Sequence, residues 1–276
     1  KREKVMDYRN TPDIEVLYSG YIDAVNEENV KKRYAGKEQY FHGSSAGMCS
    51  RKHYFAVNKV TKTNKPLPKS MRIMRLGTVV HNDFEEAMNF IETLKKEKKS
   101  SKSKERNGSN NLLSLNIGPL LSLIKDIKKI HTEKEVILEE FKVRGHYDMV
   151  FEMESGEIFL YDLKTIASYP YKLKFGRNPE MNKSMHQELQ VATYGLAILE
   201  KFERLDGMFL YYYNKDTSML KQKEVPMTYL NEAERYWTEL NNRIEMGLPP
   251  VDEGISPVHS WECNYCNFKD HCWKTE

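Results

Sequence analysis

The stretch FKVRGHYDMVFEMESGEIFLYDLK, residues 141–164, decides the predicted fold. Two runs rich in aromatic and β-branched residues, 141–151 and 157–164, lie on either side of the turn sequence Glu-Ser-Gly-Glu at 154–157. Ser and Gly mark the ends of strands, so the pattern predicts a β-hairpin. We expect the rest of the chain to be organised around this hairpin.

Three charged side chains of the hairpin predict a metal site. Asp148 lies in the middle of the first strand, and Asp162 and Lys164 share one face of the second strand because side chains alternate along it. Two carboxylates and an amine beside apolar residues are costly unless they bind something, and a divalent cation is the usual compensation. The alternative is that Asp148 is a turn residue and that the other two lie on a solvated strand edge.

The order Asp148, then Asp162-Leu163-Lys164, resembles the PD-(D/E)XK nuclease superfamily. The resemblance implies an α/β fold with a PD-(D/E)XK restriction-endonuclease-like core, which is a mixed central sheet flanked by helices. It also implies that the two acids and the carbonyl of Leu163 hold Mg²⁺ or Mn²⁺. Lys164 is then expected to orient or activate the attacking water.

Residues 70–91 have apolar side chains at helical spacing and contain the motif Gly77-x-x-x-His81. A histidine on such a helix is more often a satisfied core residue than a ligand. Here, however, the motif resembles the first motif of RecB-like and Cas4-like nucleases, which implies that His81 joins the metal site. Glu85, one turn later on the same face, is a candidate to support the ligands from behind.

Residues 186–202 predict a second amphipathic helix, on which Gln190 and Tyr194 share a face. Gln-x-x-x-Tyr after the Asp-x-Lys strand resembles the last motif of the RecB nuclease family. The resemblance implies that both side chains contact DNA and support the active site. The alternative is a polar rim residue and a half-buried tyrosine.

The four cysteines occupy two places in the chain: Cys49, and the terminal group Cys263, Cys266 and Cys272. In a reducing compartment this spacing indicates a metal or cluster site before it indicates disulfides. Taken alone, Cys49 would be a buried structural thiol, and His259 or His271 would complete a local zinc knuckle. The full set resembles the iron–sulfur arrangement of Cas4 and of the AddB and Dna2 nuclease domains. That resemblance implies a [4Fe–4S] cluster that staples the two ends around the nuclease core.

Two segments are candidates for DNA binding. The predicted loop after Thr165 carries aromatic and basic side chains that would stack on and neutralise a single strand: Tyr169, Tyr171, Lys172, Lys174 and Arg177. Residues 95–111, rich in Lys, Ser and Asn, predict a flexible basic loop, and we expect its Lys95–Arg106 part to complete the same surface. The alternatives are an aromatic loop packed over the sheet and a solvated linker.

Composition limits the class of protein. Of the 276 residues, 39% are hydrophobic and 30% are charged, which is typical of a soluble globular protein. Lys and Arg total 43 against 40 Asp and Glu, so any basic footprint must be local. The sequence has no apolar run long enough to span a bilayer and no signal-peptide core at its start, so we expect a cytoplasmic protein of a prokaryote or of a virus in its host, without a membrane partner.

We expect three parts: an N-terminal helical segment, 1–45; a nuclease core, 46–250; and a C-terminal cysteine cluster, 251–276. The other predicted elements are a helix at 12–28, a serine-capped short helix at 44–55, helical spacing at 112–130, strands at 135–140, 208–213 and 220–226, and a helix at 229–246.

Together these features predict a metal-dependent DNA nuclease, an exonuclease that acts on single-stranded ends, with endonuclease activity as a further expectation. Recombination, repair and CRISPR adaptation are the candidate processes, and a helicase, a recombinase or a Cas1-like protein is a candidate partner. The sequence lacks a P-loop motif and hence a helicase motor of that kind. The alternative is a catalytically inactive nucleic-acid-binding or adaptor protein with a structural cluster. The intact Asp148, Asp162 and Lys164 argue against that alternative.

Overall fold

A computed structural model describes the chain over residues 12–34, 40–101, 118–177, 185–249 and 260–273. The strands are β1 (Phe41–His42), β2 (Ile127–Leu138), β3 (Val143–Met153), β4 (Ile158–Ile166), β5 (Gly207–Asn214) and β6 (Leu220–Val225). The helices are α1 (Ile14–Tyr34), α2 (Ser50–Val57), α3 (Pro68–Ser101), α4 (Gly118–Leu123), α5 (Ser168–Phe175), α6 (Met185–Phe202), α7 (Tyr229–Glu245), α8 (Ser260–Tyr265) and α9 (Lys269–Trp273), with a 3₁₀ turn η2 at Gly43–Ser45.

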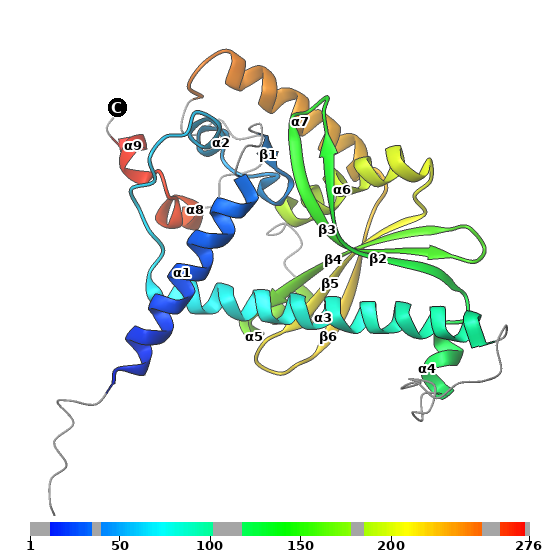
Figure 1. Ribbon diagram of the computed structural model, residues 1–276. Helices are drawn as coiled ribbons and strands as arrows, with labels where there is room; N and C mark the ends of the chain where they lie inside the picture. The colour runs from blue at the N-terminus through cyan, green and yellow to red at the C-terminus, as the bar shows by residue number, and fades with distance from the viewer. Residues whose placement is uncertain (1–11, 35–39, 102–117, 178–184, 250–259, 274–276) are drawn as a thin grey trace, which may run out of the picture.

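The strands form one mixed sheet (Figure 1). Strand β3 pairs antiparallel with β2 and with β4, β5 runs parallel to β4, and β6 returns antiparallel to β5. The parallel step from β4 to β5 crosses over through α5 and α6, because parallel neighbours need a long connection. The predicted hairpin and its turn at 154–157 are confirmed, and so is the predicted mixed sheet with flanking helices.

Helices cover both faces of the sheet. Neighbouring side chains on β5 show this, since Tyr211 makes an edge contact with Phe84 of α3, whereas the hydroxyl of Tyr212 donates to Gln187 of α6. Successive side chains of a strand point to opposite faces, so α3 and α6 lie on opposite sides. Helix α7 packs behind α6, where Trp237 Nε1 donates to Thr193 Oγ1 at 2.8 Å within the main hydrophobic core. Figure 1 shows α3 as a long helix crossing the strands.

Two predicted segments were wrong in extent or type. Helix α3 continues to Ser101, so residues 95–101 are helical instead of looped; Lys and Glu are good helix formers. Residues 102–111 of that predicted loop lie outside the described residues. Of the predicted helical stretch 112–130, residues 112–117 also lie outside the described residues, α4 covers Gly118–Leu123, and β2 already begins at Ile127 because it pairs along β3.

Two local predictions near the ends of elements also need correction. The predicted loop after Thr165 is helix α5, in which Pro170 lies in the first turn, where its missing N–H costs nothing. The serines at 44 and 45 belong to the η2 turn, and the residue that precedes α2 is Cys49, which makes no side-chain cap. Among the described helices, none combines the length and apolar character needed to cross a bilayer.

Candidate metal centre and active site

The candidate site lies where one edge of β3 changes partner. Val143 pairs with Leu138 of β2 and with Phe41 of β1, whereas Met149 pairs with β2 and with Tyr161 of β4. Since a strand has only two edges, β1 and β4 share the edge opposite β2. Positions 145–148, between their registers, have no registered partner on this edge among the described strands. The gap leaves room for side chains from the helices.

Asp148 closes the end of this gap. It lies one position beyond the last registered pair of β3 and β4, Met149 with Tyr161. Its Oδ2 accepts a hydrogen bond from the backbone N–H of Leu163 at 2.5 Å, so a side chain takes the place of a backbone ladder bond. The other oxygen, Oδ1, faces His81.

Asp162, Lys164 and Gln190 form a closed triangle of polar contacts. Lys164 Nζ lies 2.5 Å from Asp162 Oδ2 and donates to Gln190 Oε1 at 2.8 Å, while Gln190 Nε2 donates to Asp162 Oδ1 at 3.1 Å. Asp162 is only 1% exposed. Burial raises the pKa of Asp162 to about 6, although the Lys164 ammonium opposes this shift.

Tyr194 lies against the gap in the sheet edge from α6 and is 3% exposed. Its ring fits there because two facing positions lack a side chain. A Cβ atom on Gly43 or on Gly145 would lie 2.5 Å from Tyr194 Cε1. Burial raises the pKa of Tyr194, and the nearby Asp162 adds to the shift, so the phenol stays protonated.

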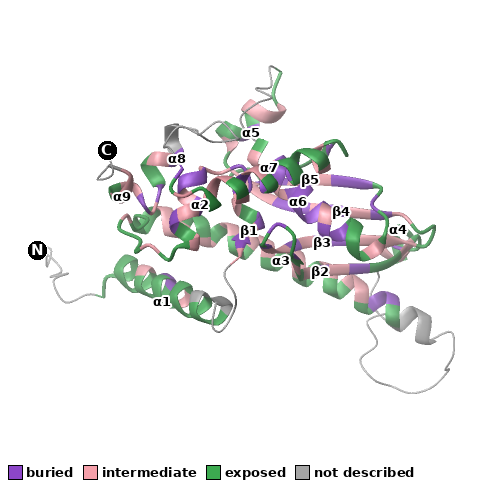
Figure 2. Ribbon diagram, turned by 90° about the horizontal axis from the view of Figure 1, so that it is seen from above, coloured by how far each residue is buried: buried purple, intermediate pink, exposed green. Residues whose placement is uncertain are grey.

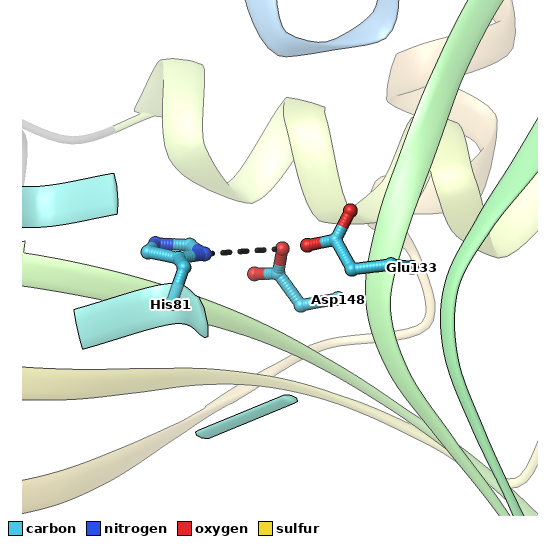
Figure 3. A group of neighbouring side chains, drawn as sticks. All are labelled: His81, Glu133 and Asp148. Carbon is cyan, nitrogen blue, oxygen red and sulfur yellow. Dashed lines mark ion pairs between the residues drawn. The ribbon is translucent and has the colours of Figure 1, made fainter. Parts of the chain in front are cut away.

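His81, Glu133 and Asp148 form a second cluster next to this triangle (Figure 3). Helix α3 supplies His81, whose Nδ1 lies 3.3 Å from Asp148 Oδ1. Strand β2 supplies Glu133, and one potential ligand atom from each of the three residues lies within 4.8 Å of the other two. Burial alone would lower the pKa of His81, but the Asp148 carboxylate raises it above the ordinary value.

Sequence reasoning missed Glu133. Its neighbours Thr132 and Lys134 pair with Met149 and Tyr147, which places Glu133 opposite Asp148. Burial, followed by the repulsion from Asp148, raises the pKa of Glu133 to about 7. Glu133 can be identified as a neighbour of Asp148 only once the register of β2 on β3 is known.

A cleft of about 200 Å³ opens beside these groups. It is lined by His42, Ser44, Glu133, Arg144, Gly145, His146, Asp148, Gln190 and Tyr194. Glu85 lies close enough for its charge to raise the pKa of Glu133 further. The structure therefore brings His81, Asp148, Asp162, Lys164, Gln190 and Tyr194 to one place, and their chemical roles stay predictions.

The two parts of the chain that carry the cysteines lie side by side. The backbone N–H of Cys49 donates to Glu262 Oε1 at 3.3 Å, and His271 Nε2 lies 2.8 Å from the carbonyl of Thr61. The Phe55 and Phe268 rings pack at 5.6 Å between centroids. These contacts join segments more than two hundred residues apart in the sequence. The predicted knuckle ligand His259 lies outside the described residues.

The four cysteine thiols lie close enough to interact electrostatically, and they form no disulfide. Cys49 and Cys272 each interact with Cys266, which also interacts with Cys263. Burial raises the pKa of Cys49, Cys266 and Cys272. A set of partly buried thiols fits a soft metal or cluster, whose positive charge favours the thiolate.

The predicted DNA-binding residues do not all lie on an open surface. Tyr169 is 73% exposed, but Tyr171 is 6% exposed and packs against Phe175, so its ring is part of the core and the prediction for it was wrong. Lys172 and Arg177 are exposed on α5 and just after it. Lys174 Nζ lies 4.7 Å from the centre of the Tyr212 ring.

The basic segment at the end of α3 belongs to a different part of the molecule. Lys95 is buried and lies 3.6 Å from Glu92, which accepts the backbone N–H of Ile130 in β2. Helix α5, in contrast, follows β4 and packs on β5 through Phe175 and Tyr212. Figure 2 shows α5 and the C-terminal end of α3 on opposite sides of the sheet. The prediction that Lys95 and α5 share one surface was therefore wrong.

Comparisons with known proteins identify the family of the chain. Residues 44–273 match the family model of the PD-(D/E)XK nuclease superfamily. The solved structure of SSO0001 is similar at 15% identity and a TM-score of 0.47, over 93% of this chain and 96% of that one. A protein from Eubacterium rectale, whose name assigns it provisionally to the exonucleases, is similar at 18% identity and a TM-score of 0.48, over 90% and 92% of the two chains. No curated protein gave a significant match. The family match covers most of the chain, which therefore belongs to the PD-(D/E)XK nuclease superfamily.

Proposed function

We propose that this nuclease is a metal-dependent deoxyribonuclease, an exonuclease that hydrolyses phosphodiester bonds at single-stranded DNA ends. One observation carries the proposal. The two hairpin acids, the lysine and the α3 histidine meet at the open edge of β3, although His81 and Lys164 come from distant parts of the chain. Such a set of hard oxygen ligands, one imidazole and one ammonium is what phosphodiester hydrolysis with a divalent cation requires.

The residues present fit a divalent cation. Asp148 Oδ1 and His81 Nδ1 face each other, and Asp162 lies on the adjacent strand, followed by Leu163, whose backbone N–H donates to Asp148 Oδ2 and whose carbonyl we propose as a further ligand. Carboxylate oxygens suit Mg²⁺ or Mn²⁺, and the imidazole favours Mn²⁺. When bound by these groups, a cation would supply orientation of the attacking water, a lower pKa of that water and compensation of charge on the phosphate oxygens.

Lys164 and Gln190 have separate tasks in the proposed reaction. The ammonium of Lys164 provides a fixed positive charge close to where negative charge develops on the phosphate. Gln190 contacts both Lys164 and Asp162, so we assign it as a positioning residue that fixes the distance between them. Tyr194, packed beside it, holds α6 against the edge of β3.

The substrate surface follows α5. The exposed Tyr169 can stack on a base, and Lys172 and Arg177 can neutralise phosphates without reading the sequence. Stacking of unpaired bases favours a single strand over a duplex, because duplex bases already stack on each other. This consideration supports the proposed preference for single-stranded ends.

The cysteines support assignment to the RecB/Cas4-like branch with a [4Fe–4S] cluster. Cys49, Cys263, Cys266 and Cys272 would ligate it and so fasten α2 to the C-terminal helices, where Glu262 already links the two segments. A helicase, recombinase or Cas1-like protein remains the proposed class of partner, in recombination, repair or CRISPR adaptation.

Digestion of end-labelled single and double strands tests the nuclease proposal. Wild type, Asp162→Ala and the exposed control Asp23→Ala should be prepared identically and compared with Mg²⁺, Mn²⁺ or EDTA. We expect cleavage by wild type and Asp23→Ala, loss of cleavage in EDTA, and none by Asp162→Ala. Equal residual activity in wild type and Asp162→Ala would reveal a contaminating nuclease and remove the site from consideration.

Metal analysis tests the cluster separately. Protein purified without oxygen should contain iron and absorb visible light, and Cys49→Ala should lose both and become poorly soluble. A preparation that holds stoichiometric zinc and no iron would contradict the iron–sulfur assignment while leaving the nuclease proposal standing.

A further inference from the structure

We propose that Glu133 is a further ligand of the catalytic cation and binds it together with His81 and Asp148. This inference rests on the proposed nuclease function and extends its metal site by one carboxylate from β2. The family resemblance pointed to the α3 histidine and the hairpin acids, whereas Glu133 follows from the packing of β2 alone.

The three side chains converge from three elements. Figure 3 shows His81 and Glu133 pointing toward Asp148 from opposite sides. One potential ligand atom of each lies within 4.8 Å of the other two. Around a cation with bonds of about 2.1 Å, neighbouring ligands are about 3 Å apart and opposite ligands about 4.2 Å apart. Small side-chain movements therefore suffice to close this group on one ion.

The oxygens of the hairpin acids are already largely engaged. Asp162 is buried, with one oxygen accepting from Gln190 and the other beside the Lys164 ammonium. Asp148 uses Oδ2 for the backbone of Leu163 and presents only Oδ1 toward His81. Asp148 Oδ1 is thus the hairpin oxygen that faces His81, and Glu133 supplies a further negative oxygen at this position, in addition to Asp162 on the neighbouring strand.

The placement of Glu133 is unfavourable without a cation. It lies opposite Asp148 on adjacent antiparallel strands, where like charges destabilise the pairing. Its backbone has φ of 46°, in the left-handed region that a glutamate seldom adopts. A bound cation would remove the repulsion between the two carboxylates, which gives this arrangement a physical reason.

Direct measurement of Mn²⁺ binding, without DNA, tests the inference. Calorimetric or spin-resonance titrations should compare wild type with Glu133→Gln and with the control Glu135→Gln, which changes the same side chain two positions along β2, where it pairs with Arg144. We expect Glu133→Gln to raise the Kd for Mn²⁺ by about tenfold or more, since loss of even an outer partner of a metal ligand has that size. Glu135→Gln should stay within about twofold of wild type.

Thermal unfolding separates a ligand from a structural residue. Because Glu133→Gln removes the repulsion from Asp148, the Tm of the metal-free variant should equal or exceed that of wild type, while the increase in Tm on adding Mn²⁺ should shrink. Glu133→Asp keeps the charge but shortens the side chain, and it should also weaken Mn²⁺ binding. Unchanged Mn²⁺ affinity in both variants would overturn the inference.

The outcomes also distinguish this inference from the proposed function. If wild type cleaves DNA and binds Mn²⁺, and Glu133→Gln binds Mn²⁺ equally well, only the role of Glu133 is refuted. If wild type binds no Mn²⁺ or Mg²⁺, the metal-dependent nuclease proposal and this inference fail together.

Discussion

Gly145→Ala tests whether the missing side chain on β3 is what admits Tyr194 to the site. The new methyl group would lie 2.5 Å from Tyr194 Cε1 and 3.0 Å from its hydroxyl oxygen. Carbon atoms pack at about 3.5 Å or more, so the contact is short by about 1 Å. The Cβ position of Gly43 is equally close to the same ring atom, so two glycine backbones confine this edge of the ring.

The confinement of the Tyr194 ring determines how much Gly145→Ala destabilises the protein. Overpacking of a close-packed core typically costs about 1–3 kcal/mol, and for a chain of this size each kcal/mol lowers Tm by about 2–4 °C. We therefore expect Gly145→Ala to lower Tm by about 2–12 °C. Cleavage should also fall, because Tyr194 is one turn from Gln190, which holds Asp162 and Lys164 in place. Gly118→Ala, where a new Cβ meets no atom within 4 Å, is the matched control and should change stability by less than about 0.5 kcal/mol.

A double-mutant cycle assigns the cost to its cause. Denaturant unfolding would be measured for wild type, Gly145→Ala, Tyr194→Ala and the double variant. If the ring is the obstacle, Gly145→Ala should cost almost nothing in the Tyr194→Ala background, which gives a coupling energy of about 1 kcal/mol or more. An equal cost in both backgrounds would show that the methyl clashes elsewhere, and the reasoning about Tyr194 would fail.

Three further predictions concern pH, chemistry and substrate. Burial lowers the pKa of His53 to about 3, so the contribution of neutral His53 to stability is complete above the unfolded-state pKa of about 6.5 and is lost as pH falls. Between pH 8 and pH 5, the free energy of unfolding should therefore fall by about 2 kcal/mol more for wild type than for His53→Asn. Equal losses in denaturant titrations would contradict this prediction. Lys164→Ala should retain Mn²⁺ affinity but cleave on the order of 100-fold more slowly in single-turnover assays, and a large loss of Mn²⁺ binding would make Lys164 a structural residue instead. Lys172→Ala with Arg177→Ala should weaken binding of all oligonucleotide sequences alike and reduce its salt dependence, whereas a sequence-selective loss would indicate base recognition.

The sequence was sufficient for the hairpin because its signals are local. Alternation, β-branched residues and a Ser-Gly turn act within a few residues, and they placed Asp148 and Asp162 on neighbouring strands before any long-range contact was known. The helix predicted over 112–130 was wrong from Ile127 onward, because apolar residues there fit either period and pairing with β3 favours the strand.

Long-range packing explains the other errors. Tyr171 was predicted to face DNA because it lies among aromatic and basic residues in a predicted loop, yet its ring in α5 packs against Phe175 in the core. Lys95 belonged to a charged run that is typical of loops, but α3 continues through it and buries the side chain beside Glu92. In both segments the composition indicates an exposed surface, but the orientation of the helix determines which of the side chains are exposed.

The charge balance of the site explains why its acids need so many partners. Asp148, Asp162 and Glu133 bring three carboxylates to the edge of β3, and the Lys164 ammonium lies against one of them, Asp162. A DNA phosphate approaching this group would meet net negative charge. In the proposed reaction a divalent cation would reverse that sign, so the groups proposed to bind the cation would also determine whether the scissile phosphate can enter the cleft. On this proposal, binding of metal and binding of the reacting phosphate are coupled through the same three carboxylates.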